Sequence, residues 1–281
     1  MAITNFIPTI WSETLARKLA AEYVGVKNCS HDFDGEIRGK GSTVKILGLN
    51  DITVSDYTKN SDLSSPSALT DFAKIITIDQ AKAFNFIIDD IDRAQAVPGI
   101  MELAMEQAAA ALADAADKYV FSLCSEATTA NTITDSAATE STILDDVILA
   151  RETLLANGVG ASVPTVLEVS PEVAALLLKA KILNSTDNDG AVSNGALGSL
   201  IGFEVYVSAN ITKSSGVNKC FARTKRAIAF AEQINSVEAY RPELRFADAV
   251  KGLHLYGAKT VFPNELILLN IKKKTAEASG T

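Results

Sequence analysis

Two acidic clusters come nearest to the spacing of a metal site. Asp89, Asp90 and Asp92 place three carboxylates within four positions, and carboxylate oxygens are common ligands of divalent cations. Their position directly before a helical pattern favours a simpler role, as the end of a strand followed by a helix cap. Asp187–Gly190 resembles part of a calcium loop, but a loop begun at Ser185 has an alanine at position twelve, where a bidentate Glu is required. Neither cluster predicts a metal site.

Residues suited to nucleophilic catalysis or phosphate binding lack the necessary spacing. The glycines of GALGSLIG do not follow GxGxxG, and they lead into a predicted strand instead of opening a helix. Ser199 lies outside a GxSxG motif. His31 lies in an acidic linker, and His254 lies in a predicted strand, where we expect it to face solvent or a structural partner. Because no recognisable nucleophile has a base and an orienting partner, we predict no catalytic residue, no cofactor and no enzyme activity.

Composition argues against several other classes of protein. Cys29, Cys124 and Cys220 are far apart and form no CxxC motif, which is typical of buried thiols in a reducing cytoplasm. The formal net charge of -8 argues against a surface built to grip nucleic acid, and the short basic run Lys272–Lys274 is typical of a solubilising tail. Apolar runs are too short for a membrane span and the N-terminus does not resemble a secretion signal, so we predict no membrane contact.

The longest helix that the sequence predicts is alanine-rich and extends over Pro98–Glu126. Its apolar residues recur every three or four positions, and Pro98 suits a first helical turn. Asp92 is a candidate upstream cap, and Glu102 and Glu106 favour the early turns. At 1.5 Å per residue this helix would be roughly 40 Å long, more than many compact domains, so it must lie across a larger structure.

Two features precede this helix. Ile7–Tyr23 is predicted to be an amphipathic helix that ends an N-terminal arm, and Trp11, the only tryptophan, is expected in the core, with an interface as the alternative. Residues 32–90 alternate like strands on either side of a polar stretch, which predicts a long hairpin excursion. Because an isolated two-stranded hairpin is marginal in water, it needs a surface, and neighbouring copies of the chain are a natural candidate.

The second half mixes helices and strands. After the predicted polar connector TTANTITDSAATESTI comes a helix over Leu144–Ala156, closed by Asn157 and Gly158. The strand TVLEVS leads into a helix opened by Pro171, a long Asn- and Gly-rich loop NSTDNDGAVSNGALGSLI follows, and the remaining pattern is strand-rich. This order predicts an α+β or α/β domain and strands that return to the long helix.

The order of these parts resembles a known family. The matching segments are FIPTIWSETL, DGEIRGKGSTVKI, FNFIIDDIDRAQA, GSLIGFEVYVSANI and FADAVKGLHLYGAKTVFPNELILL. Together they resemble the major capsid protein of tailed bacteriophages, with the Hong Kong 97-type fold. The resemblance covers most of the chain and implies an α+β capsid fold with an N-terminal arm, an extended two-stranded loop, a long spine helix, a peripheral domain and an α/β axial domain.

The resemblance also implies a division of the chain. It places the N-terminal arm at 1–31, the extended loop at 32–90, the peripheral domain with the spine helix at 91–138 and the axial domain at 139–234. The returning strands of the peripheral domain would be 235–271 and the tail 272–281. The excursion would lie over an adjacent subunit, where charged residues set register more than strength. The interface candidates are Trp11, Arg38, Lys40, Lys45, Lys59, Glu102 and Glu106.

The implied function is a structural subunit that forms pentamers and hexamers of an icosahedral head around double-stranded DNA, without sequence-specific binding. A net acidic charge suits such a shell because it limits sticking to packed DNA. Because the arm begins almost at Met1, we expect scaffolding to come from a separate protein. The resemblance also implies a portal protein as a partner. It implies assembly in the bacterial host cytoplasm and a final location in the virion. Lys40, Lys45, Lys59 or Lys74 could supply an amine for cross-linking, but no acceptor motif is evident, and we predict no cross-link.

Three alternatives remain open. An encapsulin-like shell resembles the same fold but encloses enzyme cargo. A small-molecule enzyme would use the α/β region, although no convergent set of His, Cys and carboxylate residues supports it. A tail or tube subunit would form helical particles in place of closed ones.

Overall fold

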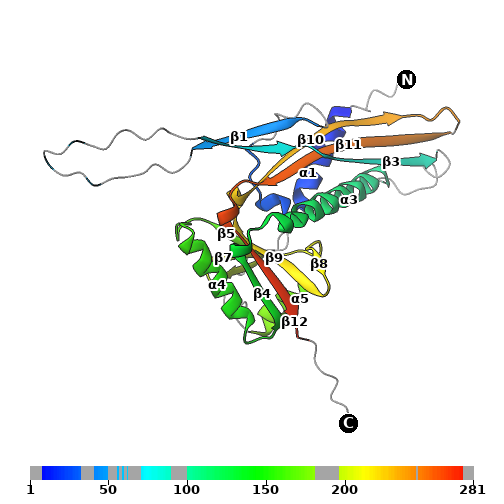
Figure 1. Cartoon of the computed structure of the whole chain (residues 1–281). Coiled ribbons are helices and arrows are strands. Elements are labelled where there is room, and N and C mark those ends of the chain that lie inside the picture. The colour runs from blue at the N-terminus through cyan, green and yellow to red at the C-terminus, as the bar shows by residue number, and fades with distance from the viewer. Residues whose placement is uncertain are drawn as a thin grey trace, which may run out of the picture.

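The described strands form three sheets, which divide the structure into an upper and a lower region in Figure 1. The computed structural model describes residues 8–32, 41–49, 56, 59, 62, 71–89, 100–180, 196–244 and 246–274. The upper, elongated region holds a three-stranded and a two-stranded sheet, and the lower region holds a seven-stranded sheet. The chain crosses between the two regions several times, because β10 and β11 belong to the upper region while β9 and β12 belong to the lower one.

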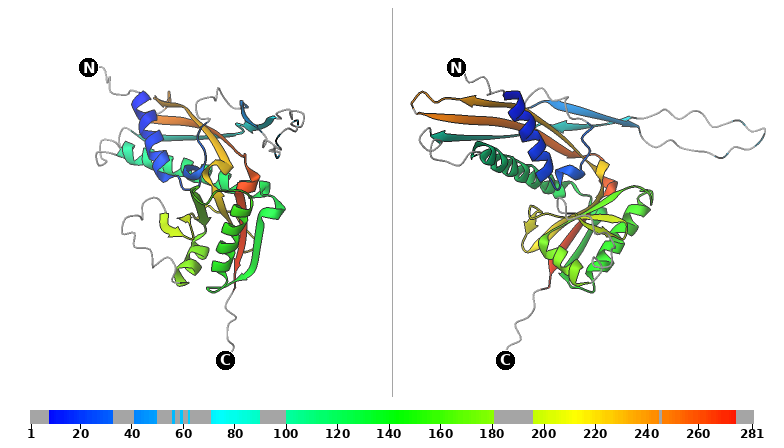
Figure 2. Two further views of the ribbon diagram at one scale, coloured as in Figure 1. Left: turned by 90° about the vertical axis from the view of Figure 1, so that its left-hand side faces the viewer. Right: turned by 180° about the vertical axis from the view of Figure 1, so that it is seen from behind.

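The three-stranded sheet of the upper region supports two helices. It consists of β10 (Ile228–Tyr240), β11 (Ala247–Thr260) and β3 (Gln80–Asp89), all antiparallel in that order. Helices α1 (Pro8–Glu22) and α3 (Ile100–Ser122) pack on each other and against this sheet (Figure 2). Apolar side chains exclude water between these layers. They include Leu15, Leu19, Met105, Ala109, Val237 and Val250.

Helix α3 confirms the predicted long helix. It continues after Ser122 as one 3-10 turn, Leu123–Glu126, so the helical stretch ends where the sequence predicted. Twenty-three residues at 1.5 Å each give about 35 Å. Ala109, Ala113 and Ala116 lie on its buried side, and their small side chains allow α1 and the sheet to approach the helix closely.

A separate hairpin extends from the upper region. Strands β1 (Thr43–Leu49) and β2 (Asp71–Thr77) pair antiparallel and project from one end of the three-stranded sheet (Figures 1 and 2). At the base of the hairpin the chain crosses β11 at Gly257, where a Cβ would lie 2.4 Å from the carbonyl oxygen of Thr77. Glycine is therefore required for this close approach. The buried cluster at this crossing comprises Val44, Ile46, Ile76, Ile78, Ala229, Ala231, Leu255 and Val261.

The lower region is a mixed sheet with two helices packed on it. The strand order is β4-β12-β9-β5-β7-β6, with β8 paired to β9. The strands are β4 (Thr132–Ala138), β5 (Thr165–Val169), β6 (Ala196–Leu200), β7 (Phe203–Val207), β8 (Lys213–Ser214), β9 (Val217–Thr224) and β12 (Leu266–Lys273). Both helices, α4 (Ile143–Ala156) and α5 (Pro171–Lys179), pack against β12.

Local sequence explains where these two helices begin and end. Ser170 caps α5 by accepting a hydrogen bond from the Val173 N–H, with Pro171 at the first helical position. Helix α4 ends at Ala156, and Gly158 follows with φ of 87°, a conformation that glycine adopts readily. Both predicted helices are therefore confirmed to within a few residues.

Three predictions differ from the structure. The predicted polar connector contains β4, which pairs in parallel with β12. The predicted loop after α5 contains β6, which pairs with β7. The sequence also grouped β3 with the hairpin excursion, whereas β3 pairs with β11 in the three-stranded sheet. The partners of β4 and β3 come from distant parts of the chain that a local pattern does not reveal, whereas β6 pairs with the strand that follows it after two residues.

Candidate functional site

The hairpin offers one exposed face. Lys45 of β1 and Ile75 of β2 are directly opposite each other in the strand pairing, and both are exposed. Val44 and Ile76, the next pair, are buried against the body of the same chain. Because successive side chains of a strand point to opposite faces, this alternation leaves a strip with an apolar and a basic side chain free to contact another surface.

Two of the predicted interface residues lie on α3. Glu102 is exposed in the first turn. Glu106 forms an ion pair with Lys18 of α1, with 2.5 Å between Nζ and Oε1. Both side chains of that pair are nearly half exposed, so solvent screens the pair and it adds little to stability. The described contact of Glu106 is thus within the chain.

The remaining predicted residues are only partly placed. Lys59 is exposed. Trp11 belongs to α1, but its side chain lies outside the described residues. Arg38 and Lys40 lie outside the described residues altogether, as do Asp90 and Asp92 of the first acidic cluster and the second acidic cluster. Within the described part of the chain, no group of three His, Cys, Asp or Glu residues could hold a metal ion.

Exposed apolar side chains mark further contact surfaces that the sequence analysis did not single out. Leu244 and Phe246, in the turn between β10 and β11, are 97% and 83% exposed. On α4, Ile148, Leu149 and Leu155 face solvent although the opposite side of the helix is buried. Large apolar side chains exposed together are typical of protein–protein contact sites.

A buried polar junction joins the two regions. Arg223 of β9 and Glu168 of β5 lie side by side in the lower sheet, and neither side chain has any exposed surface. Two hydrogen bonds of 2.9 Å connect them, from Nε to Oε2 and from Nη2 to Oε1. Arg223 also donates to the carbonyl oxygens of Gly25 and Asn28, in the segment after α1. The guanidinium therefore fastens the N-terminal segment to the lower sheet.

Asp117 of α3 holds the same segment from the other side. Its carboxylate accepts backbone N–H bonds of 2.9 to 3.0 Å from Val24, Gly25 and Val26. Burial raises the pKa of Asp117 to about 6, and the three backbone hydrogen bonds oppose that shift. Of the residues that sequence reasoning missed, only Glu168 had a clear signal, since it is a lone charge in the apolar strand TVLEVS, whereas Asp117 adjoins Lys118 and Arg223 precedes Lys225 closely.

The two histidines, weighed as catalytic candidates, lie in structural surroundings. His254 is buried on β11, and its Nε2 lies 3.0 Å from Oε2 of Glu232, which also accepts a hydrogen bond from Tyr23 of the N-terminal segment. Of the two environments predicted for His254, solvent or a structural partner, the structure shows the structural partner. His31 packs edge-on against Phe230, with 3.0 Å from its Nε2 to the Val26 carbonyl oxygen.

All three cysteines are buried and unpaired by disulfides, as predicted. Burial raises the pKa of both Cys29 and Cys220 to about 12, which keeps these thiols protonated and unreactive at neutral pH. No described helix combines the length and apolar character that a membrane crossing needs.

Comparison with known proteins supplies the identification. The sequence model of a family described as phage capsid protein matches residues 71–267, which is more than half of the chain. The chain belongs to the phage capsid protein family. It is a structural subunit of a phage head, and the predicted α+β capsid fold is confirmed. The match does not favour the encapsulin-like alternative. No curated protein sequence matches the capsid protein.

Solved structures resemble the capsid protein over nearly its whole length. A chain of Mycobacterium phage Che8 is 29% identical, with a TM-score of 0.69, and the similarity covers 96% of this chain and 98% of that one. A capsid chain of the cyanophage P-SCSP1u is 15% identical, with a TM-score of 0.67 and 90% of each chain covered. A virus-like particle from Pyrococcus furiosus is 12% identical, with a TM-score of 0.59, 93% of this chain and 98% of that chain covered. The last two likenesses concern the fold alone.

Proposed function

We propose that this capsid protein assembles into pentamers and hexamers of a closed icosahedral head that encloses double-stranded DNA. The observation that carries the proposal is the β1–β2 hairpin. In the described residues its sheet has two strands, and one of its faces presents Lys45 and Ile75 to solvent. Because a two-stranded hairpin is marginal by itself, a neighbouring subunit beneath that face would stabilise it.

The domain layout inferred from the sequence is part of this proposal. The arm (1–31), extended loop (32–90), peripheral domain (91–138 and 235–271), axial domain (139–234) and tail (272–281) would correspond to the roles these parts have in the capsid fold. The upper region, with α3 and the three-stranded sheet, supports the peripheral assignment of those elements, and the lower region with the seven-stranded sheet supports the axial one. The ranges fit less well at β4 and most of β12, which fall in the peripheral ranges but belong to the seven-stranded sheet, and at the start of β10, which falls in the axial range but belongs to the three-stranded sheet. The strand β3 would then serve the peripheral sheet although its sequence lies in the loop segment.

Partners and location follow from the same role. We propose a separate scaffolding protein, a portal, assembly in the host cytoplasm and DNA enclosed without sequence-specific contacts. The acidic charge of -8 supports the last point, because a shell of like charge repels packed DNA. We propose no catalytic role, since both histidines lie in structural contacts.

Electron microscopy of the protein, expressed alone and with its candidate scaffold, tests the proposal. We expect closed shells tens of nanometres across. The hairpin role is tested by Lys45→Glu with Ile75→Glu, which places two carboxylates on the exposed face and should reduce shell yield strongly. A matched control, Lys82→Glu with Lys225→Glu, changes exposed lysines elsewhere. Helical tubes would contradict the closed head, cargo enzyme in native particles would favour an encapsulin, and equal yields from both variants would reject the hairpin contact.

A further inference from the structure

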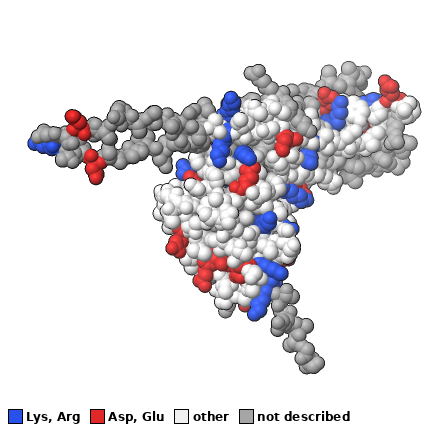
Figure 3. Space-filling view, in the orientation of Figure 1, with Lys and Arg blue, Asp and Glu red and all other residues white. Residues whose placement is uncertain are grey.

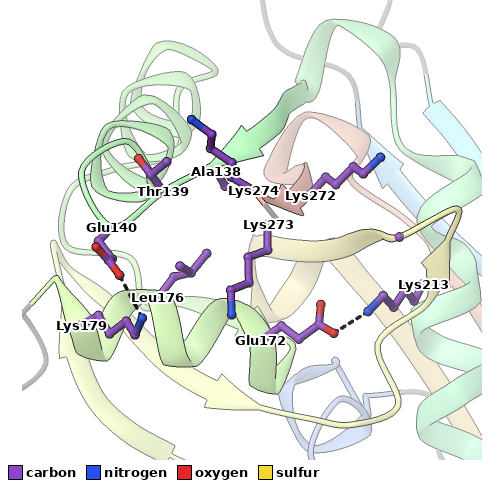
Figure 4. A pocket seen from close by; sticks show the side chains of 11 residues that line it. Ala138, Thr139, Glu140, Glu172, Leu176, Lys179, Lys213, Lys272, Lys273 and Lys274 are labelled. Atoms are coloured by element: carbon purple, nitrogen blue, oxygen red, sulfur yellow. Dashed lines mark hydrogen bonds and ion pairs between the residues drawn. The ribbon is translucent and has the colours of Figure 1, made fainter. Parts of the chain in front are cut away.

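A basic groove of about 830 Å³ lies in the lower region and takes no part in the contacts described above. Lys272 and Lys273 at the end of β12, and Lys274 directly after it, line one side of the groove (Figure 4). Lys179 of α5 and Lys213 of β8 line the other parts, together with Glu140 and Glu172. Figure 3 shows basic side chains gathered at the lower end of the molecule, beside acidic ones.

The charges in the groove do not balance. Lys179 pairs with Glu140 at 3.0 Å, and Lys213 pairs with Glu172 at 2.5 Å. Five lysines against two glutamates leave an excess of three positive charges. Lys272, Lys273 and Lys274 form no ion pair with a described residue. This local excess stands on a protein whose formal net charge is -8, so it is a feature of this groove and not of the whole surface.

The excess charge acts on the acids that remain. Hydrogen bonds from Lys213 and Asn218 lower the pKa of Glu172, and the charge of Lys273 adds to the effect. In Figure 4, Lys273 extends from the end of β12 toward α5, where Lys179 is already held by Glu140. Lys273 therefore brings a further ammonium group into a site whose carboxylates are occupied.

The lining favours phosphate over an acidic protein segment. A protein partner of useful affinity needs apolar anchors, but the apolar lining residues Leu176 and Ala138 are buried within the fold. Lysine ammonium groups are hydrated point charges on flexible stems, and they bind phosphate without a fixed geometry. The volume exceeds that of one phosphate and accommodates several. We propose that this groove binds a phosphate-bearing polyanion, a chemistry that free polyphosphate and a nucleic-acid backbone share.

Calorimetric titration of assembled full-length shells with inorganic tripolyphosphate tests the site. We expect saturable binding that the triple variant Lys272→Gln, Lys273→Gln, Lys274→Gln weakens at least tenfold. A twelve-residue oligothymidylate, followed by fluorescence anisotropy, tests the nucleic-acid source. For this probe, the plot of log K against log salt should be shallower by about 2 for the triple variant than for the wild type. Each phosphate of a single strand that a lysine neutralises contributes about 0.7 to this slope.

The matched control removes three exposed lysines elsewhere, with Lys27→Gln, Lys82→Gln and Lys225→Gln. We expect this variant to bind within twofold of the wild type. Equal losses in both variants would show a general charge effect and overturn the site, as would undiminished binding by the groove variant. Tighter binding of poly-glutamate than of either phosphate probe would overturn the ligand class in favour of an acidic protein. Shell formation, scored by microscopy for each variant, separates failure of this proposal from failure of assembly.

Discussion

Arg223 and Glu168 form a doubly hydrogen-bonded ion pair in which neither side chain is exposed. The pair lies within the lower sheet, yet Arg223 also binds the carbonyl oxygens of Gly25 and Asn28. Asn28 in turn donates to Glu168. Because a buried charge must be compensated by partners, the N-terminal segment, β5 and β9 are fixed in one arrangement. The junction between the two regions is therefore polar and specific as well as apolar.

Removing one charge of this pair should cost far more than removing an exposed one. Glu168→Gln keeps the side-chain shape but leaves the buried guanidinium without a counter-charge, and we expect a loss of about 3 to 5 kcal/mol in the free energy of unfolding. Glu238→Gln removes the negative charge from the exposed pair with Lys251 and should change the free energy of unfolding far less, because solvent screens that pair. Urea unfolding of the unassembled subunit, followed by circular dichroism, measures both. Equal losses would contradict the role assigned to Arg223.

Asp117 predicts a particular pH dependence of stability. Its folded-state pKa is about 6, against about 4 for an unfolded chain, so the native state binds more protons between these values. The contribution of Asp117 to the free energy of unfolding is therefore greatest below pH 4 and falls as the pH rises to 6. A difference of about two pKa units, at about 1.4 kcal/mol each, makes this fall up to about 3 kcal/mol. Burial also raises the pKa of Asp146 to about 6, so Asp117→Asn should make the decline measured by urea unfolding between pH 4 and 7 shallower without abolishing it.

The control for Asp117 lies one turn earlier on the same helix. Asp114 is more exposed, and the hydrogen bond from Lys118 lowers its pKa. Its contribution has the opposite sign, present at neutral pH and lost as pH falls. Asp114→Asn should therefore leave the decline between pH 4 and 6 in place. A decline as steep in Asp117→Asn as in the wild type would assign it to other groups, such as Asp146.

The sequence predicts the helices better than the sheets. Alanine and leucine spacing indicates α3, and Pro171 and Gly158 mark helix boundaries, because these are local signals. The strand β4 has a polar pattern, and its partner β12 lies far along the chain, where Leu268 pairs with Thr132. Such pairing depends on tertiary context.

The polar junction could be predicted only in part. Burial of Glu168 follows from the apolar strand around it. Its partnership with Arg223 does not, because the two residues lie 55 positions apart and become neighbours only when β5 pairs with β9. The exposure of Leu244 was likewise missed, since no local pattern distinguishes a buried leucine from an exposed one near a turn.

The position of the hairpin base should depend on the absence of a side chain at Gly257. Any Cβ at this position would lie 2.4 Å from the carbonyl oxygen of Thr77, the last residue of β2. Gly257→Ala must therefore displace this end of β2 from β11. We expect a loss of about 1 to 3 kcal/mol in the free energy of unfolding, together with a lower shell yield. At Gly160 an added Cβ meets only Val163, at 3.6 Å, and Gly160→Ala should stay within about 1 kcal/mol of the wild type. An unaffected Gly257→Ala would contradict the close crossing.

Substitutions in the exposed turn between β10 and β11 should affect assembly of the subunits without affecting their folding. Leu244 and Phe246 bury little surface within the subunit, so Leu244→Ser with Phe246→Ser should change the free energy of unfolding by no more than about 0.5 kcal/mol. If a neighbouring subunit covers both side chains, each contributes about 1.5 to 3 kcal/mol to the contact. Since 1.4 kcal/mol is a tenfold change in an equilibrium constant, the concentration needed for shells should rise at least tenfold.

Light scattering against protein concentration measures that threshold, with Glu243→Ser as the control in the same turn. The control keeps both apolar side chains and should assemble at the wild-type threshold. A loss in the control as well would attribute the effect to the conformation of the turn. An unchanged threshold in the double variant, with unfolding also unchanged, would show that these two side chains stay exposed in the assembled head and that its subunits meet through other surfaces, such as the exposed side of α4.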